Sequence, residues 1–164
     1  MALEKASQSQ IPVYVLGAGT NLLIDDEGLS GLIIKMTDMN QVIIDGENVV
    51  AEAGIRVPYL SSILMANELS GFEFAASIPG SLGGAVVMNA GAHGRDISSC
   101  LKKVLVSDYN GNTKYLLKEE LDFSYRNSIF KKKRDLIILE IHLDLVKKTR
   151  DIIANEILEN KKFR

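Results

Sequence analysis

The chain has 164 residues, a formal net charge of −2 at pH 7, 46% hydrophobic residues, 24% charged residues and one cysteine. This length fits one domain. The near-neutral charge gives no electrostatic reason to expect nucleic acid or an acidic membrane as a partner, and the lone Cys100 rules out an intramolecular disulfide or a cysteine-rich zinc site. No apolar run approaches the ~20 residues of a membrane span, and residues 1–10 lack the apolar centre of a signal peptide, so the sequence predicts a cytoplasmic protein.

The first half of the chain carries strand and turn signals ahead of a helix. Residues 1–10 look like the tail of a helix or a remnant that precedes the first strand. In chain order, the sequence then predicts strands at 11–16 and 32–36, a hairpin of strands 41–44 and 48–53, and a helix at 57–70. Asp45-Gly46 is a hairpin turn signal, while Pro58 near the start and Gly71 just past the end delimit the helix.

The second half is also rich in strands. We predict a hairpin of strands 101–107 and 113–117 around Asn110-Gly111, then a strand at 136–145 and a helix at 149–160. The strand at 136–145 alternates, with Ile141 and other apolar residues on one face and a solvated His142 on the other. The last helix meets no glycine stop, and both ends together predict a piece of a longer protein. The sum is an α+β fold of mixed sheets with flanking helices.

Residues 77–94 are unusually rich in small residues. Five of the 13 glycines fall between Gly80 and Gly94, and no lysine or arginine appears in this segment. Glycines let the backbone approach a ligand closely and turn its N–H groups toward phosphate oxygens, and a helix start adds partial positive charge. The segment therefore predicts either an anion-binding nest, in which Ile78, Leu82 and Val86 wall off a flat ring system, or a pair of tight turns between closely packed elements.

A second glycine segment, residues 16–23, directly follows the first predicted strand. It begins like the dinucleotide fingerprint of the Rossmann fold, but Leu22 stands in place of the third glycine. Residues 25–31 are turn-like and leave no room for a crossover helix, so this is not a Rossmann unit. A phosphate-facing turn with Thr20 and Asn21 as donors and a plain strand-ending turn both stay open.

Several other chemistries lack their motifs. No lysine follows the glycines in the Walker arrangement, and no Gly-x-Ser-x-Gly elbow surrounds Ser81. His93, Asp96 and Cys100 lie close in sequence, but a buried, unreactive cysteine is the favoured interpretation over thiol catalysis.

A cationic segment follows near residue 126. Tyr125 and Arg126 are predicted on opposite faces of a strand, where the arginine is either a surface residue or a donor to a carboxylate or phosphate. The basic run 131–134 is predicted to be a solvated loop, with contact to a diphosphate or a nicotinamide cofactor's phosphate as the alternative.

Four segments together carry a family resemblance. They are VLGAGTNLL at 15–23, SIPGSLGGA at 77–85, MNAGA at 88–92 and FSYRNS at 123–128. In this order and spacing they resemble the UDP-N-acetylenolpyruvoylglucosamine reductases of peptidoglycan precursor synthesis. The FAD-binding domain of that family is of the vanillyl-alcohol oxidase/para-cresol methylhydroxylase type.

The resemblance implies a cytoplasmic flavoprotein oxidoreductase of cell wall biogenesis, and through it of cell shape and cell division. NADPH serves the family as hydride donor to FAD, and the enolpyruvyl ether of UDP-N-acetylglucosamine is then reduced to UDP-N-acetylmuramate. Arg126 matches the catalytic arginine that holds the substrate carboxylate and stabilises the developing enolate, and Tyr125 matches a tyrosine beside the substrate. The small-molecule UDP-sugar is the expected partner, without nucleic acid, membrane or metal.

The resemblance also implies the cofactor-binding residues and the domain limits. The residues expected to bind FAD are Gly17, Ala18, Gly19, Thr20, Asn21, Leu22, Ile78, Pro79, Gly80, Ser81, Gly83, Gly84, Ala85, Asn89, Ala90, Gly91 and Ala92. The FAD-binding domain is expected at 11–146, after the remnant at 1–10, and 147–164 would begin a linker helix to a C-terminal substrate domain. The full-length family is monomeric, whereas a fragment with apolar residues at a cut edge is prone to self-association.

Departures from the family pattern limit the expected activity of this chain. Nothing in the chain matches the family's proton-donating serine, its catalytic glutamate or its N-terminal strand. In addition, Thr20 replaces a serine, and His93 stands where an aromatic residue is frequent. We therefore expect the isolated chain to bind FAD weakly or not at all and to lack useful turnover. The alternatives are a non-catalytic or degenerate flavin- or nucleotide-binding module and another oxidase of the same superfamily, against which the segment 125–128 argues.

Overall fold

A five-stranded antiparallel sheet forms the centre of the computed structural model, which describes residues 2–162. Its strand order is β3 (Val42–Asp45), β4 (Asn48–Glu52), β10 (Ile137–Asp144), β8 (Leu101–Ser107) and β9 (Thr113–Leu117). The predicted hairpins β3–β4 and β8–β9 are confirmed, with Asp45 paired to Asn48 and Ser107 to Thr113. The central strand β10 pairs with β4 on one side and β8 on the other, so residues distant in sequence close the sheet.

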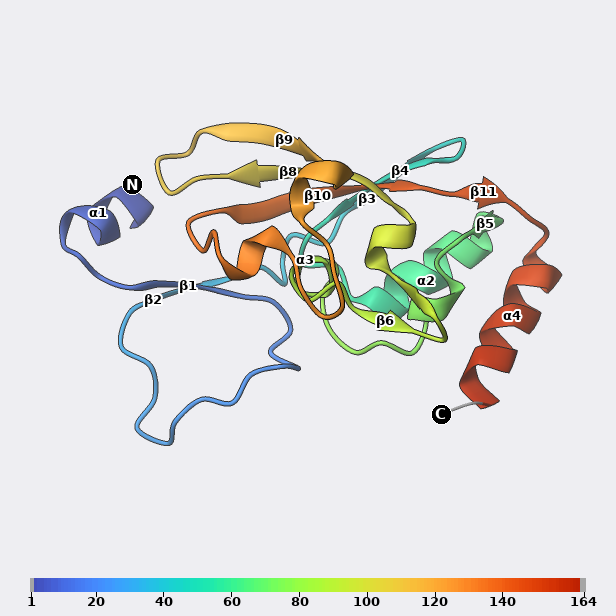
Figure 1. Cartoon of the computed structure of the whole chain (residues 1–164), viewed down its shortest axis with the longest axis horizontal. Coiled ribbons are helices and arrows are strands. Elements are labelled where there is room, and N and C mark those ends of the chain that lie inside the picture. The colour runs from blue at the N-terminus through green and yellow to red at the C-terminus, as the bar shows by residue number, and fades with distance from the viewer. Residues whose placement is uncertain (1, 163–164) are drawn as a thin grey trace.

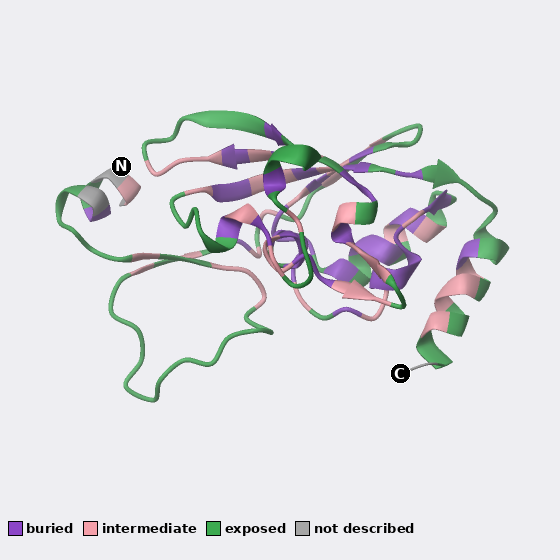
Figure 2. Ribbon diagram, viewed as in Figure 1, coloured by how far each residue is buried: buried purple, intermediate pink, exposed green. Residues whose placement is uncertain are grey.

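Helices cover one face of this sheet (Figure 1). The helices are α2 (Val57–Ala66), α3 (Leu82–Val87) and α4 (Arg150–Lys162), with short 3-10 turns at Glu73–Ala75, Ile97–Ser99, Lys118–Leu121 and Ile129–Lys131. Helix α3 packs against β10, and α4 packs against α2 and the turn at Glu73–Ala75. The core lies between the sheet and α2 and α3, where Ile55, Leu60, Leu82 and Ile141 are fully buried (Figure 2).

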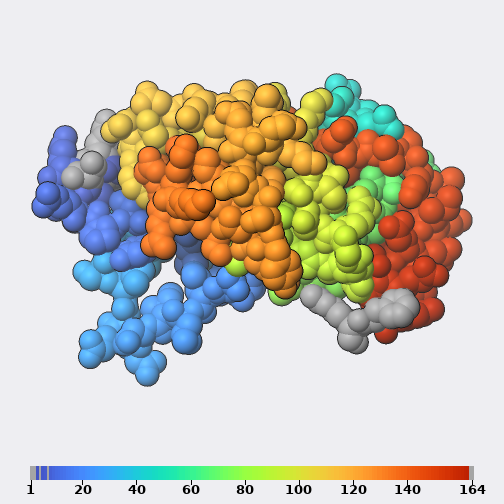
Figure 3. Space-filling model, in the orientation of Figure 1, coloured from blue at the N-terminus to red at the C-terminus, as the bar shows by residue number. Residues whose placement is uncertain are grey.

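The N-terminal part forms a separate two-stranded unit. Helix α1 (Ala2–Gln8) precedes β1 (Val13–Leu16), which pairs in parallel with β2 (Leu32–Lys35). Parallel strands need a long connection, usually a helix, but residues 17–31 make it here without one, as the turn-like composition predicts. In the space-filling view the tip of this connection stands away from the rest of the molecule (Figure 3).

The predicted helix at 57–70 is too long. Helix α2 ends at Ala66, Glu68 adopts a left-handed backbone with φ 57°, and Leu69–Ser70 form strand β5. Strand β5 pairs with β11 (Val146–Lys147), and Leu69 is 1% exposed. Helical periodicity within 57–70 carries no information about a partner strand near residue 146, so the sequence pattern extended the helix through a strand.

The prediction of a solvated His142 is also wrong. Its side chain is 19% exposed, its ring lies edge-on to Tyr115 at 5.4 Å, and its Nε2 is buried without a hydrogen-bond partner among the described residues. Burial and the neighbouring Lys103 lower the pKa of His142. Tyr115 comes from β9, and alternation within β10 alone does not show which neighbouring strand covers its outer face.

None of the helices in residues 2–162 is long and apolar enough to cross a membrane.

Two further short strands, β6 (Gly91–Ala92) and β7 (Arg95–Asp96), pair antiparallel beside α3. They follow the glycine-rich segment directly and lead back into β8. The segment 77–92 thus contains α3, which packs against β10, and ends in β6.

Candidate functional site

A cavity of about 370 Å³ opens where the turn after β1 meets the glycine-rich segment that contains α3. Both glycine segments singled out in the sequence line it, although they lie about sixty residues apart. The predicted cofactor residues that line it are Gly17, Ala18, Gly19, Thr20, Asn21, Leu22, Ile78, Pro79, Gly80, Ser81, Gly84, Ala85, Ala90 and Gly91. Arg126 lines it as well and is the one charged side chain among the lining residues.

The two loops meet in direct contact at Gly17 and Ser81. A Cβ added at Gly17 would overlap Ser81 Oγ, so any other residue here would force Ser81 or one of the loops to shift. Nearby, Gly80 has φ 126°, and Thr20 Oγ1 donates to the Pro79 carbonyl at 3.4 Å. These contacts hold the turn after β1 against the start of α3 and form one wall of the cavity.

Unused backbone donors gather at this wall. Within the described residues, the N–H groups of Ala18, Gly19, Thr20 and Asn21 have no hydrogen-bond partner, and neither has that of Gly80. Successive free N–H groups in a turn make an anion-binding concavity that needs no cationic side chain. The structure therefore favours the nest over the plain strand-ending turn for residues 17–21.

The helix start contributes less than the sequence suggested. The N–H groups of Leu82 and Gly83 donate to the carbonyls of Ile55 and Ala53, both at 2.8 Å, and Gly84 N–H donates to Ser81 Oγ at 3.4 Å. These three N–H groups are already paired within the protein, two of them with carbonyls of the connection between β4 and α2, so they are not free donors for a ligand.

Three of the predicted cofactor residues lie outside the cavity lining. Gly83 is buried, and a Cβ there would lie 2.9 Å from Ala53 Cβ, so this glycine serves close packing. Asn89 is 3% exposed and its side chain bonds to protein atoms on every side. Ala92 belongs to β6. Conversely, Val15, Val87 and Met88 line the cavity and were missed, although each lies within two residues of a predicted cofactor residue.

Arg126 lies on a tight turn and not on a strand as predicted. Ser124 and Asn127 exchange two backbone hydrogen bonds of 3.2 and 3.1 Å, and Arg126 has a left-handed φ of 54°. The predicted opposite faces for Tyr125 and Arg126 are therefore wrong. Tyr125 is 90% exposed and does not line the cavity, and its ring centroid lies 6.0 Å from the Arg126 guanidinium.

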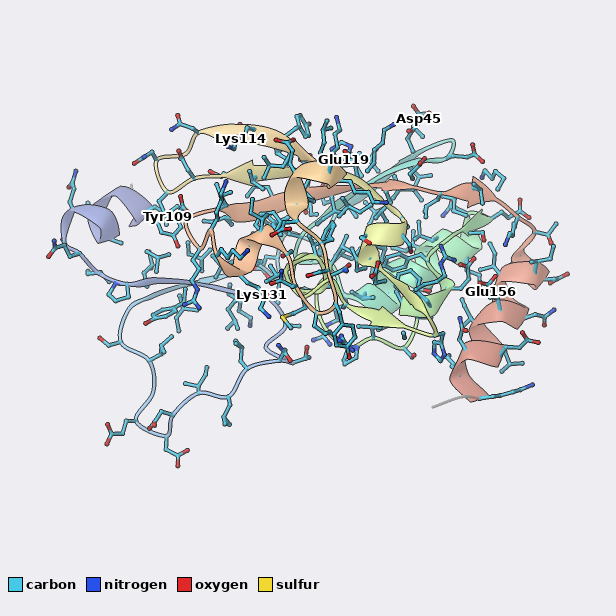
Figure 4. The ribbon with its side chains drawn as sticks, in the orientation of Figure 1. Asp45, Tyr109, Lys114, Glu119, Lys131 and Glu156 are labelled. Carbon is cyan, nitrogen blue, oxygen red and sulfur yellow. The ribbon has the colours of Figure 1, made fainter. Side chains whose placement is uncertain are left out.

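The basic run after this turn is exposed, as predicted. Lys131, labelled in Figure 4, donates from Nζ to the Arg126 carbonyl at 3.1 Å. Lys132 pairs with Asp122 at 3.3 Å, and the Arg134 carbonyl accepts from the Tyr109 hydroxyl. None of the lysines of this run lines the cavity.

The thiol is not part of a reactive site. Cys100 is 2% exposed, and burial raises its pKa to about 12. Asp96 bonds to Asn89 and Ser98, and His93 is exposed on a turn with φ 55°. The predicted burial of Cys100 is confirmed, and its lack of reactivity stays a prediction that the raised pKa supports.

Comparison with known protein families identifies the class of domain to which this fold and cavity belong. A family model described as "FAD binding domain" matches residues 1–116, and the chain therefore belongs to the FAD-binding domain family. The predicted α+β fold of this type is confirmed.

The similar proteins include UDP-N-acetylenolpyruvoylglucosamine reductases of several bacteria. The chain is 44% identical over 131 residues to the UDP-N-acetylenolpyruvoylglucosamine reductase of Caldanaerobacter subterraneus subsp. tengcongensis, a match that covers 80% of this chain and 43% of that protein. It is 42% identical to the reductase of Bacillus velezensis over 99% of this chain and 54% of that protein. The crystal structure of the reductase from Thermus caldophilus superposes with a TM-score of 0.85 at 30% identity, over all of this chain and 60% of that one.

These matches confirm the resemblance inferred from the four segments. The chain spans about half the length of the curated relatives it matches.

Proposed function

We propose that the cavity binds FAD and that the chain is the FAD-binding portion of a UDP-N-acetylenolpyruvoylglucosamine reductase. The observation that carries this proposal is the set of unpaired N–H groups from residues 18–21 and Gly80 around one cavity. A dinucleotide cofactor joins its two halves by a diphosphate, which is the anion that such donors suit. The identity to reductases over nearly the whole chain supports the same assignment.

The size and the walls of the cavity fit this cofactor. Ligand sites typically enclose about 300–1,000 Å³ and are mostly apolar with a few fixed polar groups, and this one measures about 370 Å³. Val15, Leu22 and Ile78 supply apolar surface for a flat ring system, while the backbone supplies the donors. Leu82 and Val86, which the sequence suggested for this wall, are instead fully buried and outside the cavity lining. Glycine at position 17 keeps the two loops close enough for donors from both to reach one diphosphate.

Arg126 gives the proposed site its cation. FAD, when bound, supplies hydride transfer, with NADPH as the donor. The exposed guanidinium lines the same cavity, where we assign it to hold the carboxylate of an enolpyruvyl UDP-sugar and to stabilise negative charge that develops there. Tyr125 lies beside it on the same turn, exposed and free to contact the substrate. We assign the whole protein to the cytoplasm as a monomer, in agreement with the resemblance.

Binding of FAD to the isolated chain tests the site directly. We expect a dissociation constant on the order of tens of micromolar, measured by quenching of flavin fluorescence. ADP should compete and riboflavin should bind at least ~10-fold more weakly, because the free N–H groups recognise the diphosphate. Gly111→Ala, in the β8–β9 hairpin outside the cavity, is the control and should leave the affinity unchanged. Equal binding of riboflavin and FAD by the chain, or no binding of millimolar FAD by the full-length protein, contradicts the proposal.

The catalytic part of the proposal is tested in the full-length protein through its two half-reactions. Arg126→Ala should leave reduction of the flavin by NADPH intact and slow its reoxidation by substrate about 10²–10³-fold. Equal loss in both steps would indicate a structural arginine, and unchanged reoxidation would contradict the role assigned to Arg126. A wild-type protein whose reduced flavin is not reoxidised by the substrate would favour the non-catalytic flavin-binding module.

A further inference from the structure

We infer that Asn89 is a positioning residue that holds the Arg126 turn in place beside the cavity. The inference deepens the proposed function and rests on it for the role of Arg126. Asn89 follows α3 directly and is 3% exposed, yet it does not line the cavity. Its buried amide therefore serves a purpose other than direct contact with a ligand in the cavity.

Both the nitrogen and the oxygen of the Asn89 side-chain amide form hydrogen bonds. Its Nδ2 donates to the Ser124 carbonyl at 3.1 Å and to Asp96 Oδ2 at 3.0 Å. Its Oδ1 accepts from Ser98 N–H at 3.1 Å. Because Ser98 donates to the oxygen and Asp96 accepts from the nitrogen, the amide has one favourable orientation, in which it also donates to Ser124. Ser124 is the first residue of the turn that carries Arg126.

A second contact fixes the other side of the same turn. Ser128 is fully buried, and its hydroxyl donates to the Val87 carbonyl at 2.7 Å. Asn89 and Val87 are thus two points at the end of α3 that hold residues 124 and 128. The start of α3 lies at the cavity wall, where Ser81 meets Gly17. Helix α3 therefore acts as a rigid spacer between the nest and the arginine.

Arg126 itself has few contacts that would place it. Among the described residues its guanidinium has no hydrogen bond or ion pair, and its φ of 54° is unfavourable for a residue with a side chain. Such a conformation persists when the surrounding structure imposes it. The anchors at Ser124 and Ser128 impose it here, so the position of the guanidinium depends on Asn89.

The backbone at position 89 allows a clean test. Asn89 has φ 41°, a region that glycine adopts freely. Asn89→Gly therefore removes the amide while keeping the backbone conformation. Asn89→Asp is a second variant, which keeps the acceptor for Ser98 N–H and loses both donations. Ser98→Ala is the matched control, because it removes only the hydroxyl that bonds to Asp96 and leaves the Ser98 N–H in place.

Amide hydrogen exchange of the chain without cofactor gives the first measurement. In Asn89→Gly and Asn89→Asp, the amides of Ser124 and Asn127 should exchange at least ~10-fold faster, while the amides of β10 keep their rates. Ser98→Ala should leave the turn unchanged. Unchanged exchange at the turn would overturn the inference. A uniform increase that includes β10 would also overturn it, because it would mean general destabilisation.

A double-mutant cycle on flavin reoxidation in the full-length protein gives the second measurement. Arg126→Ala should slow reoxidation by substrate about 10²–10³-fold. In the Asn89→Gly background the same substitution should slow it at most ~10-fold further, because the guanidinium is no longer held there. An equal loss in both backgrounds would overturn the positioning role. If the full-length protein binds no FAD, the proposed function fails, while the exchange measurement still decides whether Asn89 holds the turn.

Discussion

The contact between Gly17 and Ser81 gives the sharpest test of how the cavity is built. We consider Gly17→Ala, which adds a single methyl group where the turn after β1 meets the start of α3. The new Cβ would overlap Ser81 Oγ, and Ser81 Cβ would lie 3.3 Å away. Ser81 is 2% exposed and its hydroxyl accepts from Gly84 N–H, so moving the hydroxyl away from the new methyl group disturbs this hydrogen bond.

The structure can relieve this overlap in two ways, and both have a cost. Rotation of the Ser81 hydroxyl forfeits the helix cap, which costs about 1 kcal/mol. Separation of the two loops is an overpacking response of about 1–3 kcal/mol. Alanine also reduces the conformational entropy of the unfolded chain, which raises the free energy of unfolding by about 0.4–1 kcal/mol and offsets part of this cost. We therefore expect the free energy of unfolding to fall by about 1 kcal/mol, and FAD affinity to fall at least ~10-fold because displaced N–H groups lose hydrogen bonds to a charged diphosphate.

Urea unfolding followed by circular dichroism and FAD titration measure the two effects. Ser81→Ala and the double variant complete a cycle, because removal of the hydroxyl leaves only the 3.3 Å approach to Cβ. The double variant should be more stable than the sum of the single effects predicts, by at least ~1 kcal/mol. Strict additivity, or a Gly17→Ala protein with unchanged stability and FAD affinity, would refute the close contact of the two loops.

Three further predictions concern single residues. Because burial raises the pKa of Cys100 to about 12, Ellman's reagent should label the thiol only after unfolding in urea, and rapid labelling of the native protein would contradict this. Burial lowers the pKa of His142 in the folded protein below its value of about 6.5 in the unfolded chain. The stabilisation from keeping His142 neutral is therefore complete above about pH 6.5, and it is lost as the pH falls through the lower folded pKa. The urea midpoint should drop between pH 7 and pH 5, and less so in His142→Gln; the same drop in both proteins would refute the assignment. Because Arg126 has a left-handed backbone, Arg126→Gly should be about 0.5–1 kcal/mol more stable than Arg126→Ala, and equal urea midpoints would argue against that conformation.

Local signals in the sequence account for much of the fold. Asp45-Gly46 and Asn110-Gly111 set hairpin turns by their own backbone preferences, and the strands on either side pair as predicted. The turn-like stretch 25–31 excludes a crossover helix, and none forms. The glycine segments at 16–23 and 77–94 predict a close approach of backbone, and they line one cavity. Each of these properties depends on residues a few positions apart, which is why the sequence alone reveals them.

Tertiary structure decides which of those glycines and donors face the cavity. The sequence shows that Gly83 and Gly17 allow a close approach, but not that Ala53 fills the space beside one and Ser81 the space beside the other. The N–H groups of α3 are used by carbonyls of the connection before α2, and the Asn89 amide is used by Ser124. The sequence by itself determined the kind of backbone needed to hold a dinucleotide. Only the fold determined which N–H groups stay unpaired to do so, because hydrogen-bond partners come from segments that are distant in the chain.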